Sequence, residues 1–194
     1  LSTGKKVDYT YDGLNRLTKT SLNTSTDTPI DTTYTYFASK RGSDYTTTKL
    51  KYETINGEKY EYKYDAHSNI TDVTKDGVLQ YHYDYDMMNQ LVSVDDKLNG
   101  KVYNYTYDAG GNLISETVTD SNGTTRNAYE YNNSNWGDVL TSYNGQNITY
   151  DEIGNPLTYR DGMSMTWKNG RQLATLTNGD TSISYDYDSD SVRT

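Results

Sequence analysis

Tyrosine alternates with polar residues along several short stretches of the chain, with a period of two. Tyr60, Tyr62 and Tyr64 alternate with Glu61 and Lys63, and the same alternation recurs at residues 81–85 and 103–107. A period of two places successive side chains on opposite faces of a β-strand, whereas a helix would scatter these tyrosines around its circumference. The pattern therefore predicts strands with one aromatic and one polar face.

Turn signals lie between these stretches. Asn-Gly or Asp-Gly pairs are typical of tight β-hairpins, because both turn residues then adopt positive φ. We expect such turns at Asn56-Gly57, Asp76-Gly77, Asn99-Gly100, Asn122-Gly123, Asn144-Gly145, Asp161-Gly162 and Asn178-Gly179.

A seven-residue motif recurs along the whole chain: Tyr-Asp, a small polar loop, then an aliphatic residue. Clear copies are residues 11–17, 64–70, 85–91, 107–113 and 150–156, and degenerate copies begin at Tyr36, Tyr131 and Trp167. A further copy begins at Tyr187, with Ser191 where Gly would be usual. Successive copies start 17 to 28 residues apart, so we expect residues 1–194 to form a single repeat array.

Each unit is predicted to be strand, Asp-capped loop, strand and hairpin turn. The Asp can accept backbone N–H groups two or three residues on, and Gly or Asn at the fifth position tolerates a left-handed conformation. The predicted structural motif residues are Tyr11, Asp12, Tyr64, Asp65, Asn69, Tyr85, Asp86, Tyr107, Asp108, Gly111, Asn112, Tyr150, Asp151, Gly154, Asn155, Tyr187 and Asp188.

Composition supports a folded chain with a tyrosine core. Hydrophobic residues make up only 32% and mean hydropathy is -0.96, values that alone would suggest disorder. The 22 tyrosines change this interpretation, because each packed aromatic ring buries ~150–250 Å². The array is therefore predicted to be all-β: tandem hairpins in a long, curved or spiral antiparallel sheet.

Charge and composition also argue against several classes of function. A net charge of -9 without a basic patch argues against nucleic-acid binding, and no apolar run is long enough for a membrane span. Cysteine is absent, which excludes disulfides and thiol chemistry.

The sequence gives little support for catalytic or metal-binding residues. His67 and His82 are interpreted as solvated, because no Ser-His-Asp arrangement accompanies them. Residues 186–191 resemble the start of a calcium loop, but the sixth residue is Ser rather than Gly. The neighbours Asp151-Glu152 and Asp95-Asp96 could suggest a glycosidase pair, yet acidic neighbours are common in so acidic a chain. We expect no catalytic residue, no metal and no cofactor.

The motif Tyr-Asp-x-x-Gly-Asn-(Leu/Ile) resembles the YD-repeat, or RHS-repeat, family, and residues 107–113 are close to its consensus. Residues 136–156 and 167–173 are similar to RHS proteins of Gram-positive bacteria. The resemblance implies a spiral β-sheet that closes into a hollow shell, which encloses a C-terminal toxin in insecticidal toxin complexes and polymorphic toxins. In animal teneurins a similar shell presents an adhesion surface. Some bacterial relatives end in a self-cleaving Asp-Pro-x-Gly segment, but this chain has no Asp-Pro pair.

The leading functional hypothesis is thus a structural module: part of the wall of a secreted or surface-displayed shell. Its partners would be the rest of the parent shell and an enclosed passenger. The alternative is a module that binds carbohydrate or a cell-surface partner through exposed tyrosine rows, a role also associated with YD repeats. We expect the chain to be a fragment of a larger protein and to self-associate through strand edges or its aromatic face.

Overall fold

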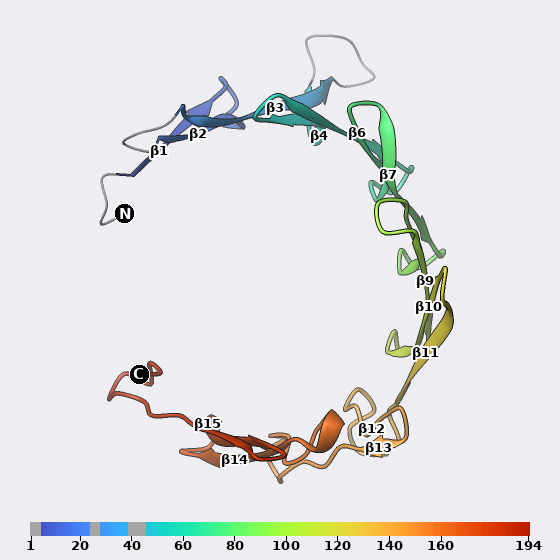
Figure 1. The fold of residues 1–194 in the computed structure, drawn as a ribbon, viewed down its shortest axis with the longest axis vertical. Coiled ribbons are helices and arrows are strands. Elements are labelled where there is room, and N and C mark those ends of the chain that lie inside the picture. Colours follow the sequence, from blue (N-terminus) through green and yellow to red (C-terminus); the bar gives the residue numbers. More distant parts are fainter. Residues whose placement is uncertain (1–4, 24–27, 39–45) are drawn as a thin grey trace. The chain divides into compact units, whose positions relative to one another are not determined.

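The computed structural model describes residues 5–23, 28–38 and 46–194 (Figure 1). The loop of the degenerate unit that begins at Tyr36 lies outside the described residues. Apart from a single 3-10 turn, η1 (Arg160–Gly162), the regular elements are strands. The strands are β1 (Lys6–Tyr11), β2 (Leu17–Asn23), β3 (Ile30–Ala38), β4 (Thr46–Ile55), β5 (Glu58–Tyr64), β6 (Ile70–Lys75), β7 (Val78–Tyr85), β8 (Leu91–Asp96), β9 (Lys101–Tyr107), β10 (Leu113–Asp120), β11 (Gly123–Glu130), β12 (Ser142–Tyr143), β13 (Gln146–Asn147), β14 (Ser164–Lys168), β15 (Gln172–Asn178) and β16 (Thr181–Ser184).

The strands follow one another in space in the order of the sequence. A 13-stranded sheet runs from β1 to β13 without a crossover, and a separate 3-stranded sheet contains β14, β15 and β16. The predicted all-β fold with an open antiparallel sheet is therefore confirmed. The last hairpins differ from the expectation of one continuous sheet, because β14, β15 and β16 form a sheet of their own.

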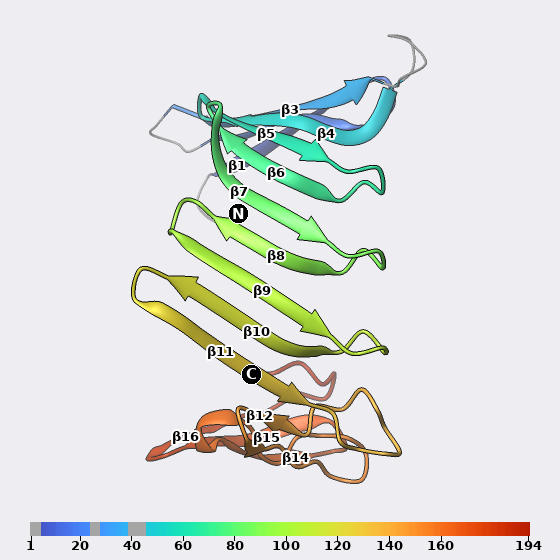
Figure 2. The same ribbon diagram turned by 90° about the vertical axis from the view of Figure 1, so that its right-hand side faces the viewer.

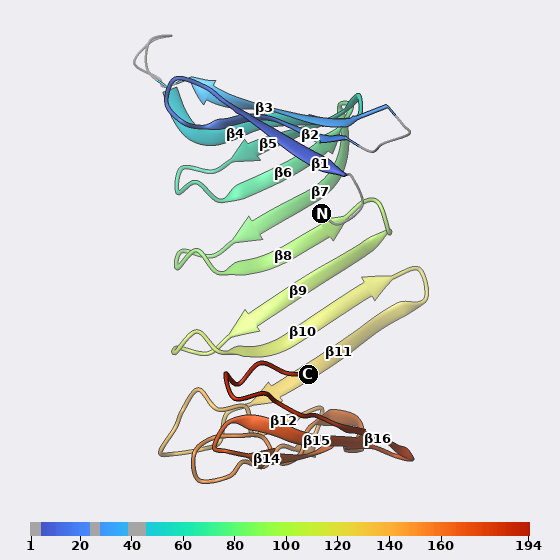
Figure 3. The ribbon, with the colours of Figure 1, turned by 90° about the vertical axis from the view of Figure 1, so that its left-hand side faces the viewer.

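The chain divides into two compact units. One contains residues 1–103 and 119–123, and the other contains residues 104–118 and 124–194. Within the first unit, β5 to β8 lie side by side, with the repeat loops after β5 and β7 at one end and the tight turn after β6 at the other (Figure 2). Figure 3 shows the same strands from the opposite side, together with β1 to β4.

The tight turns have two kinds of geometry. Both residues have positive φ in Asn56-Gly57, Asp76-Gly77, Asn144-Gly145 and Asp161-Gly162, as expected. The same expectation is wrong for the Asn-Gly pairs at 99–100, 122–123 and 178–179, where only the Gly has positive φ. In the last of these, Asn178 pairs with Thr181, so Gly179 becomes the first residue of the turn, where a type II′ hairpin places its glycine.

Strand register separates an aromatic face from a polar face in β5 to β8. Cross-strand partners share a face of the sheet, and Tyr62 pairs with Val73, which in turn pairs with Tyr81. On the opposite face, Lys63 pairs with Asp72, which pairs with His82. The sheet therefore has the two chemically different faces that the alternation of residues predicts.

The C-terminal unit departs from regular pairing after β11. The strands β12 and β13 have 2 residues each and are joined by the Asn144-Gly145 turn, and beyond them Tyr150 and Pro156 form an isolated bridge. Pro156 has no N–H to donate to a ladder, which interrupts the pairing at this point. Regular pairing resumes in the hairpin of β14 and β15.

Candidate functional site

Each repeat loop begins with an aspartate whose carboxylate binds the backbone of the same loop. Asp108 Oδ1 accepts hydrogen bonds from the N–H groups of Gly110 at 2.8 Å and Asn112 at 2.9 Å. The Asp108 N–H donates to the Asn112 carbonyl at 3.0 Å, which closes the loop. The carboxylate thus satisfies donors that the hairpin ladder leaves without a strand partner.

The same geometry recurs in the other units. Oδ1 of each motif aspartate accepts the N–H groups two and four residues further on, at 2.8 to 3.1 Å, in Asp12, Asp65, Asp86, Asp151 and Asp188. The structure thus places the aspartates from the sequence motif in one repeated loop conformation, including the unit that begins at Tyr187.

The fifth residue of each unit is left-handed. Its φ lies between 56° and 87° in Asn15, Ser68, Asn89, Gly111, Gly154 and Ser191. Ser191 adopts the same conformation as the glycines, so its presence does not alter the turn. Gly154 has a second requirement, because a Cβ there would lie 2.6 Å from the Trp136 ring. Only glycine accommodates both the positive φ and this close approach.

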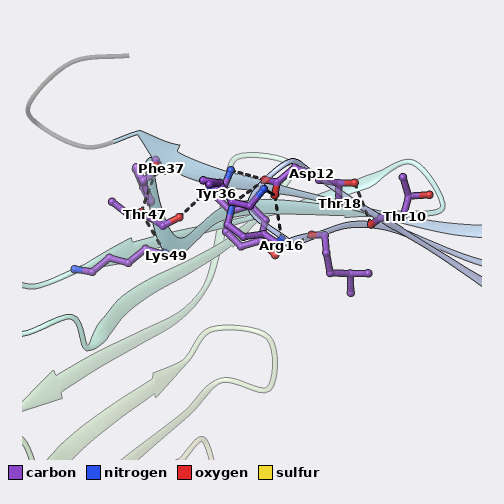
Figure 4. Close-up of polar contacts among 10 residues, drawn as sticks. Thr10, Asp12, Arg16, Thr18, Tyr36, Phe37, Thr47 and Lys49 are labelled. Atoms are coloured by element: carbon purple, nitrogen blue, oxygen red, sulfur yellow. Dashed lines mark hydrogen bonds and ion pairs between the residues drawn. The ribbon is translucent and has the colours of Figure 1, made fainter. Parts of the chain in front are cut away.

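The sixth residue of the unit holds the second carboxylate oxygen. Asn112 Nδ2 donates to Asp108 Oδ2 at 2.9 Å, and Asn69 and Asn155 make the same contact with Asp65 and Asp151. In the repeat motif of residues 11–17 an arginine replaces the asparagine, and Arg16 Nε donates to Asp12 Oδ2 at 2.7 Å (Figure 4). In these four units, a planar donor group at position six therefore holds the aspartate in place.

The same side chains also reach the following unit. Asn69 Nδ2 donates to Asn89 Oδ1 at 2.9 Å, and Asn155 Nδ2 donates to the Gly170 carbonyl at 2.7 Å. Arg16 Nη1 donates to the Thr47 carbonyl at 2.7 Å, while its guanidinium carbon lies 4.5 Å from the centre of the Tyr36 ring (Figure 4). Position six thus connects successive loops as well as stabilising its own.

Hydrogen bonds lower the pKa of several of these aspartates. The Arg16 side chain has the largest effect on Asp12, and the Asn112 side chain has the largest effect on Asp108. For Asp65, burial raises the pKa, but the hydrogen bonds from Asn69 and His67 together with the charge of His67 outweigh it and lower the pKa. These carboxylates therefore remain ionised acceptors at neutral pH.

Pairing between hairpins stops short of the repeat loops. Tyr64 pairs with Ile70 across the loop, but a bulge follows, and the pairing of β6 with β7 extends only from Lys75 to Asp72. The Ile70 carbonyl therefore lies beyond the last β6–β7 pair. The Tyr85 hydroxyl donates to that carbonyl at 2.9 Å, so a side chain continues the connection where backbone pairing ends.

The same contact is made by the first aromatic residue of other units. Each donates to the backbone carbonyl at the end of the preceding repeat loop: Tyr36 to Leu17 at 2.8 Å, Tyr64 to Leu50 at 2.8 Å, Tyr150 to Leu140 at 2.8 Å, Trp167 to Pro156 at 2.7 Å and Tyr187 to Leu173 at 3.2 Å. We call these contacts, together with Tyr85 to Ile70, the aromatic staples. Trp167 makes the bond through its indole Nε1, which is likewise a donor on an aromatic ring.

The staple hydroxyls are suited to donate. Burial raises the pKa of Tyr64, Tyr85 and Tyr150, so these hydroxyls keep their protons well into alkaline solution. Each can therefore act as a donor throughout the physiological pH range.

Sequence reasoning missed the staples and the side-chain bonds at position six. A signal for the staples is present in the sequence: the first position holds Tyr or Trp, which carry donors, and never the single Phe of the chain, Phe37. The acceptor could not be identified, because it is a backbone carbonyl 10 to 19 residues earlier.

Comparisons with known proteins agree with this geometry. A family model described as RHS Repeat matches residues 85–125. Residues 85–125 therefore match an RHS repeat. No curated protein sequence matches the chain.

Solved structures show the same fold. The chain is similar to a crystal structure of TcdB2-TccC3-Cdc42, with a TM-score of 0.62 and 18% identity over 99% of this chain and 12% of that chain. It is also similar to a Photorhabdus luminescens Tc holotoxin pore with a mutation in TccC3, with a TM-score of 0.62 and 16% identity over 98% of this chain and 12% of that chain. A crystal structure of TcdB2-TccC3 without its hypervariable C-terminal region gives a TM-score of 0.63 and 16% identity, over 99% of this chain and 12% of that chain. This chain therefore spans about an eighth of the structures it matches, and the resemblance to RHS repeats and toxin-complex shells is confirmed at the level of the fold.

The other candidate residues lie outside this repeated geometry. His67 is exposed in a repeat loop, whereas His82 contacts Asp72 Oδ1 at 2.8 Å through Nδ1 and Asp84 Oδ1 at 3.3 Å through Nε2. His82 lies on the polar face with its side chain 43% exposed, as expected for a surface residue, and its imidazole also joins a carboxylate of β6 to one of β7.

The acidic neighbours do not form carboxylate pairs. Asp95 binds Lys97 at 2.6 Å, while Asp96 is buried and binds the Asn99 side chain at 2.8 Å. Successive strand residues point to opposite faces, so these two carboxylates do not converge. Asp151 is engaged in its own loop, beside an exposed Glu152.

The calcium-like segment is similarly engaged. Asp188 serves as the aspartate of its loop, and Asp186 lies 3.2 Å from the Lys168 ammonium. Among the described residues, no group of three or more acidic or histidine side chains could hold a metal ion. Within the same residues, no helix is long and apolar enough to cross a membrane.

The staples give a direct prediction for stability. Replacing Tyr85 with Phe removes the bond to the Ile70 carbonyl, which should cost about 1 kcal/mol of the free energy of unfolding. Tyr11→Phe is the matched control, because Tyr11 occupies the same motif position but is 56% exposed, and should change stability by less than about 0.5 kcal/mol. Urea unfolding of the two variants measures both values. Equal stability of the two variants would show that the staple contributes nothing.

The loop aspartates are predicted to act as caps. Asp108→Ala should cost about 0.5–2 kcal/mol, by analogy with side-chain caps at helix ends. Asp108→Asn should cost less than Asp108→Ala, because an amide oxygen can still accept the two backbone bonds. Asp86→Asn should cost less again, because Asp108, unlike Asp86, has an asparagine amide donating to Oδ2, which a second NH₂ group would oppose. Chemical denaturation that finds all three variants as stable as the parent chain would refute the cap.

His82 makes stability depend on pH. The hydrogen bond that His82 donates to Asp72 and then the charge of Asp84 raise the pKa of His82 above the ordinary value of 6.5, with Lys63 and Asp95 as the other charged neighbours. Because the folded pKa is the higher one, this contribution is fully present below pH 6.5 and is lost as pH rises through the raised value. His82→Gln should flatten the dependence of unfolding free energy on pH in this window. An unchanged pH profile in the variant would contradict the assignment.

Proposed function

We propose that residues 1–194 are a single RHS repeat array and form part of the wall of a hollow protein shell, without a catalytic site of their own. The observation that carries the proposal is the series of aromatic staples, which bind six of the units to the preceding one by the same contact. A repeated nearest-neighbour contact is what a wall of indefinite length requires.

The exposure of the side chains supports the same role. Among the described residues, Ile148 is the only buried hydrophobic residue and no side chain is fully buried. The tyrosines of the aromatic face are only half-buried by their neighbours in the sheet. In the parent protein this face would gain cover from other parts of the shell or from an enclosed passenger.

The similarity to toxin-complex structures supports the proposal that this chain belongs to such an assembly. Because the chain spans only 12% of their length, the rest of the shell would come from other parts of a longer protein. Such a protein would be secreted or displayed at a cell surface, as the resemblance to toxin-complex shells implies. Its passenger would be enclosed by the wall.

The alternative is a glycan-binding module that uses exposed tyrosines. Tyr9, Tyr11 and Tyr159 are the exposed tyrosines of the described chain, at 58%, 56% and 37%. The motif tyrosines are less suited to this role, because the hydroxyls in the staples are already engaged with backbone carbonyls. We therefore favour the shell wall.

Self-association and glycan binding separate these two functions. A shell-wall segment with an open aromatic face should associate as its concentration rises, as measured by analytical ultracentrifugation over a wide concentration range. It should give no reproducible signal on a glycan array. A strict monomer with a reproducible glycan signal that Tyr9→Ala abolishes would contradict the shell-wall proposal.

Two neighbouring substitutions in β6 provide matched controls. Val73 lies on the aromatic face between Tyr62 and Tyr81, whereas Thr74 lies on the polar face beside Glu61. Val73→Lys should weaken association, and Thr74→Lys should leave it unchanged, provided that circular dichroism shows both variants folded. Equal association of both variants would exclude the aromatic face as the contact.

A further inference from the structure

The Asn-Gly turns differ in how firmly the asparagine side chain is held. Asn144 Oδ1 accepts the Ala128 N–H at 2.7 Å, and its Nδ2 donates to Asn127 Oδ1 at 2.9 Å. Asn99 Nδ2 donates to Asp96 Oδ2 at 2.8 Å. In both turns the side-chain amide is therefore held by hydrogen bonds to neighbouring residues.

Asn122 lacks such restraints. It is exposed in the turn between β10 and β11, and within the part of the chain that the structure describes its side chain makes no hydrogen bond. Its backbone N–H donates to Asp120 Oδ1 at 2.7 Å. The following Gly123 has open space where a side chain would be, with nothing within 4 Å of an added Cβ. The Asn122 amide carbon is therefore free to rotate towards the Gly123 nitrogen.

We propose that Asn122-Gly123 is a site of spontaneous covalent modification, at which the asparagine converts to a mixture of isoaspartate and aspartate. The Gly123 nitrogen loses its proton to water and forms a bond to the side-chain amide carbon of Asn122. The bond from that carbon to the amide nitrogen breaks, and ammonia leaves. Water then opens the resulting five-membered imide at either carbonyl.

The two products would affect the backbone of the hairpin differently. An aspartate keeps the backbone of the turn, as Asp76 does in the Asp76-Gly77 turn, where Asp76 Oδ1 accepts the Lys59 N–H at 2.9 Å. An isoaspartate inserts one methylene into the backbone between β10 and β11. The modification therefore adds a negative charge in both products and lengthens the connection in one.

The three turns provide their own internal comparison. The folded chain is incubated in mildly alkaline buffer made with heavy-oxygen water, and peptides containing residues 99, 122 and 144 are followed by mass spectrometry. Position 122 should gain heavy oxygen several-fold faster than positions 99 and 144. In urea the three rates should converge, because the hydrogen bonds that protect Asn99 and Asn144 are lost.

Two outcomes would overturn the proposal. One is equal rates at the three positions in the folded chain, which would show that the side-chain bonds give no protection. The other is an unchanged ranking in urea, which would show that local sequence rather than structure sets the rate. Asn127→Ala supplies a matched variant: it removes one bond to Asn144 and should raise the rate at position 144 alone.

Discussion

The aromatic staple is the contact on which the rest of this repeat structure depends. Two hairpins joined by a tight turn pair well near the turn but separate before they reach the repeat loops, because a bulge follows each loop. The carbonyl beyond the last pair would then face the gap without a strand partner. A hydroxyl or indole N–H from the next unit binds it, at 2.7 to 2.9 Å in most units, and keeps the separating strands connected.

The repeat loop makes this geometry reproducible. The aspartate binds two backbone N–H groups, the left-handed fifth residue reverses the chain, and the sixth residue binds the second carboxylate oxygen. These contacts fix where the second strand begins, and thus where its first carbonyl lies. The staple of the next unit then meets an acceptor in a defined position, so each part of the motif serves the contact between units.

Much of this arrangement was predictable from the residues, and the remainder has physical reasons for being hidden. Alternating tyrosines indicate the strands and their two faces, and Tyr-Asp followed by Gly, Asn or Ser indicates the loop with a left-handed residue. The staples were not predictable, because every residue has a backbone carbonyl and the sequence does not indicate which one accepts the bond. The turn at Asn178-Gly179 was misjudged, because the position of the turn residues depends on the strand register, which pairs Asn178 with Thr181. The separation of β14 to β16 from the larger sheet depends on the interrupted pairing near Pro156 and also could not be derived from local propensities.

Hydrogen exchange followed by mass spectrometry tests most directly whether staples couple neighbouring units. If Tyr85 binds the unit that ends in Ile70, then Tyr85→Phe should increase exchange in the backbone on both sides of the contact, in residues 65–72 as well as residues 83–91. Exchange in the remote hairpin of β14 and β15 should not change. An increase confined to the substituted strand, with unchanged protection in residues 65–72, would contradict the central role assigned to the staple.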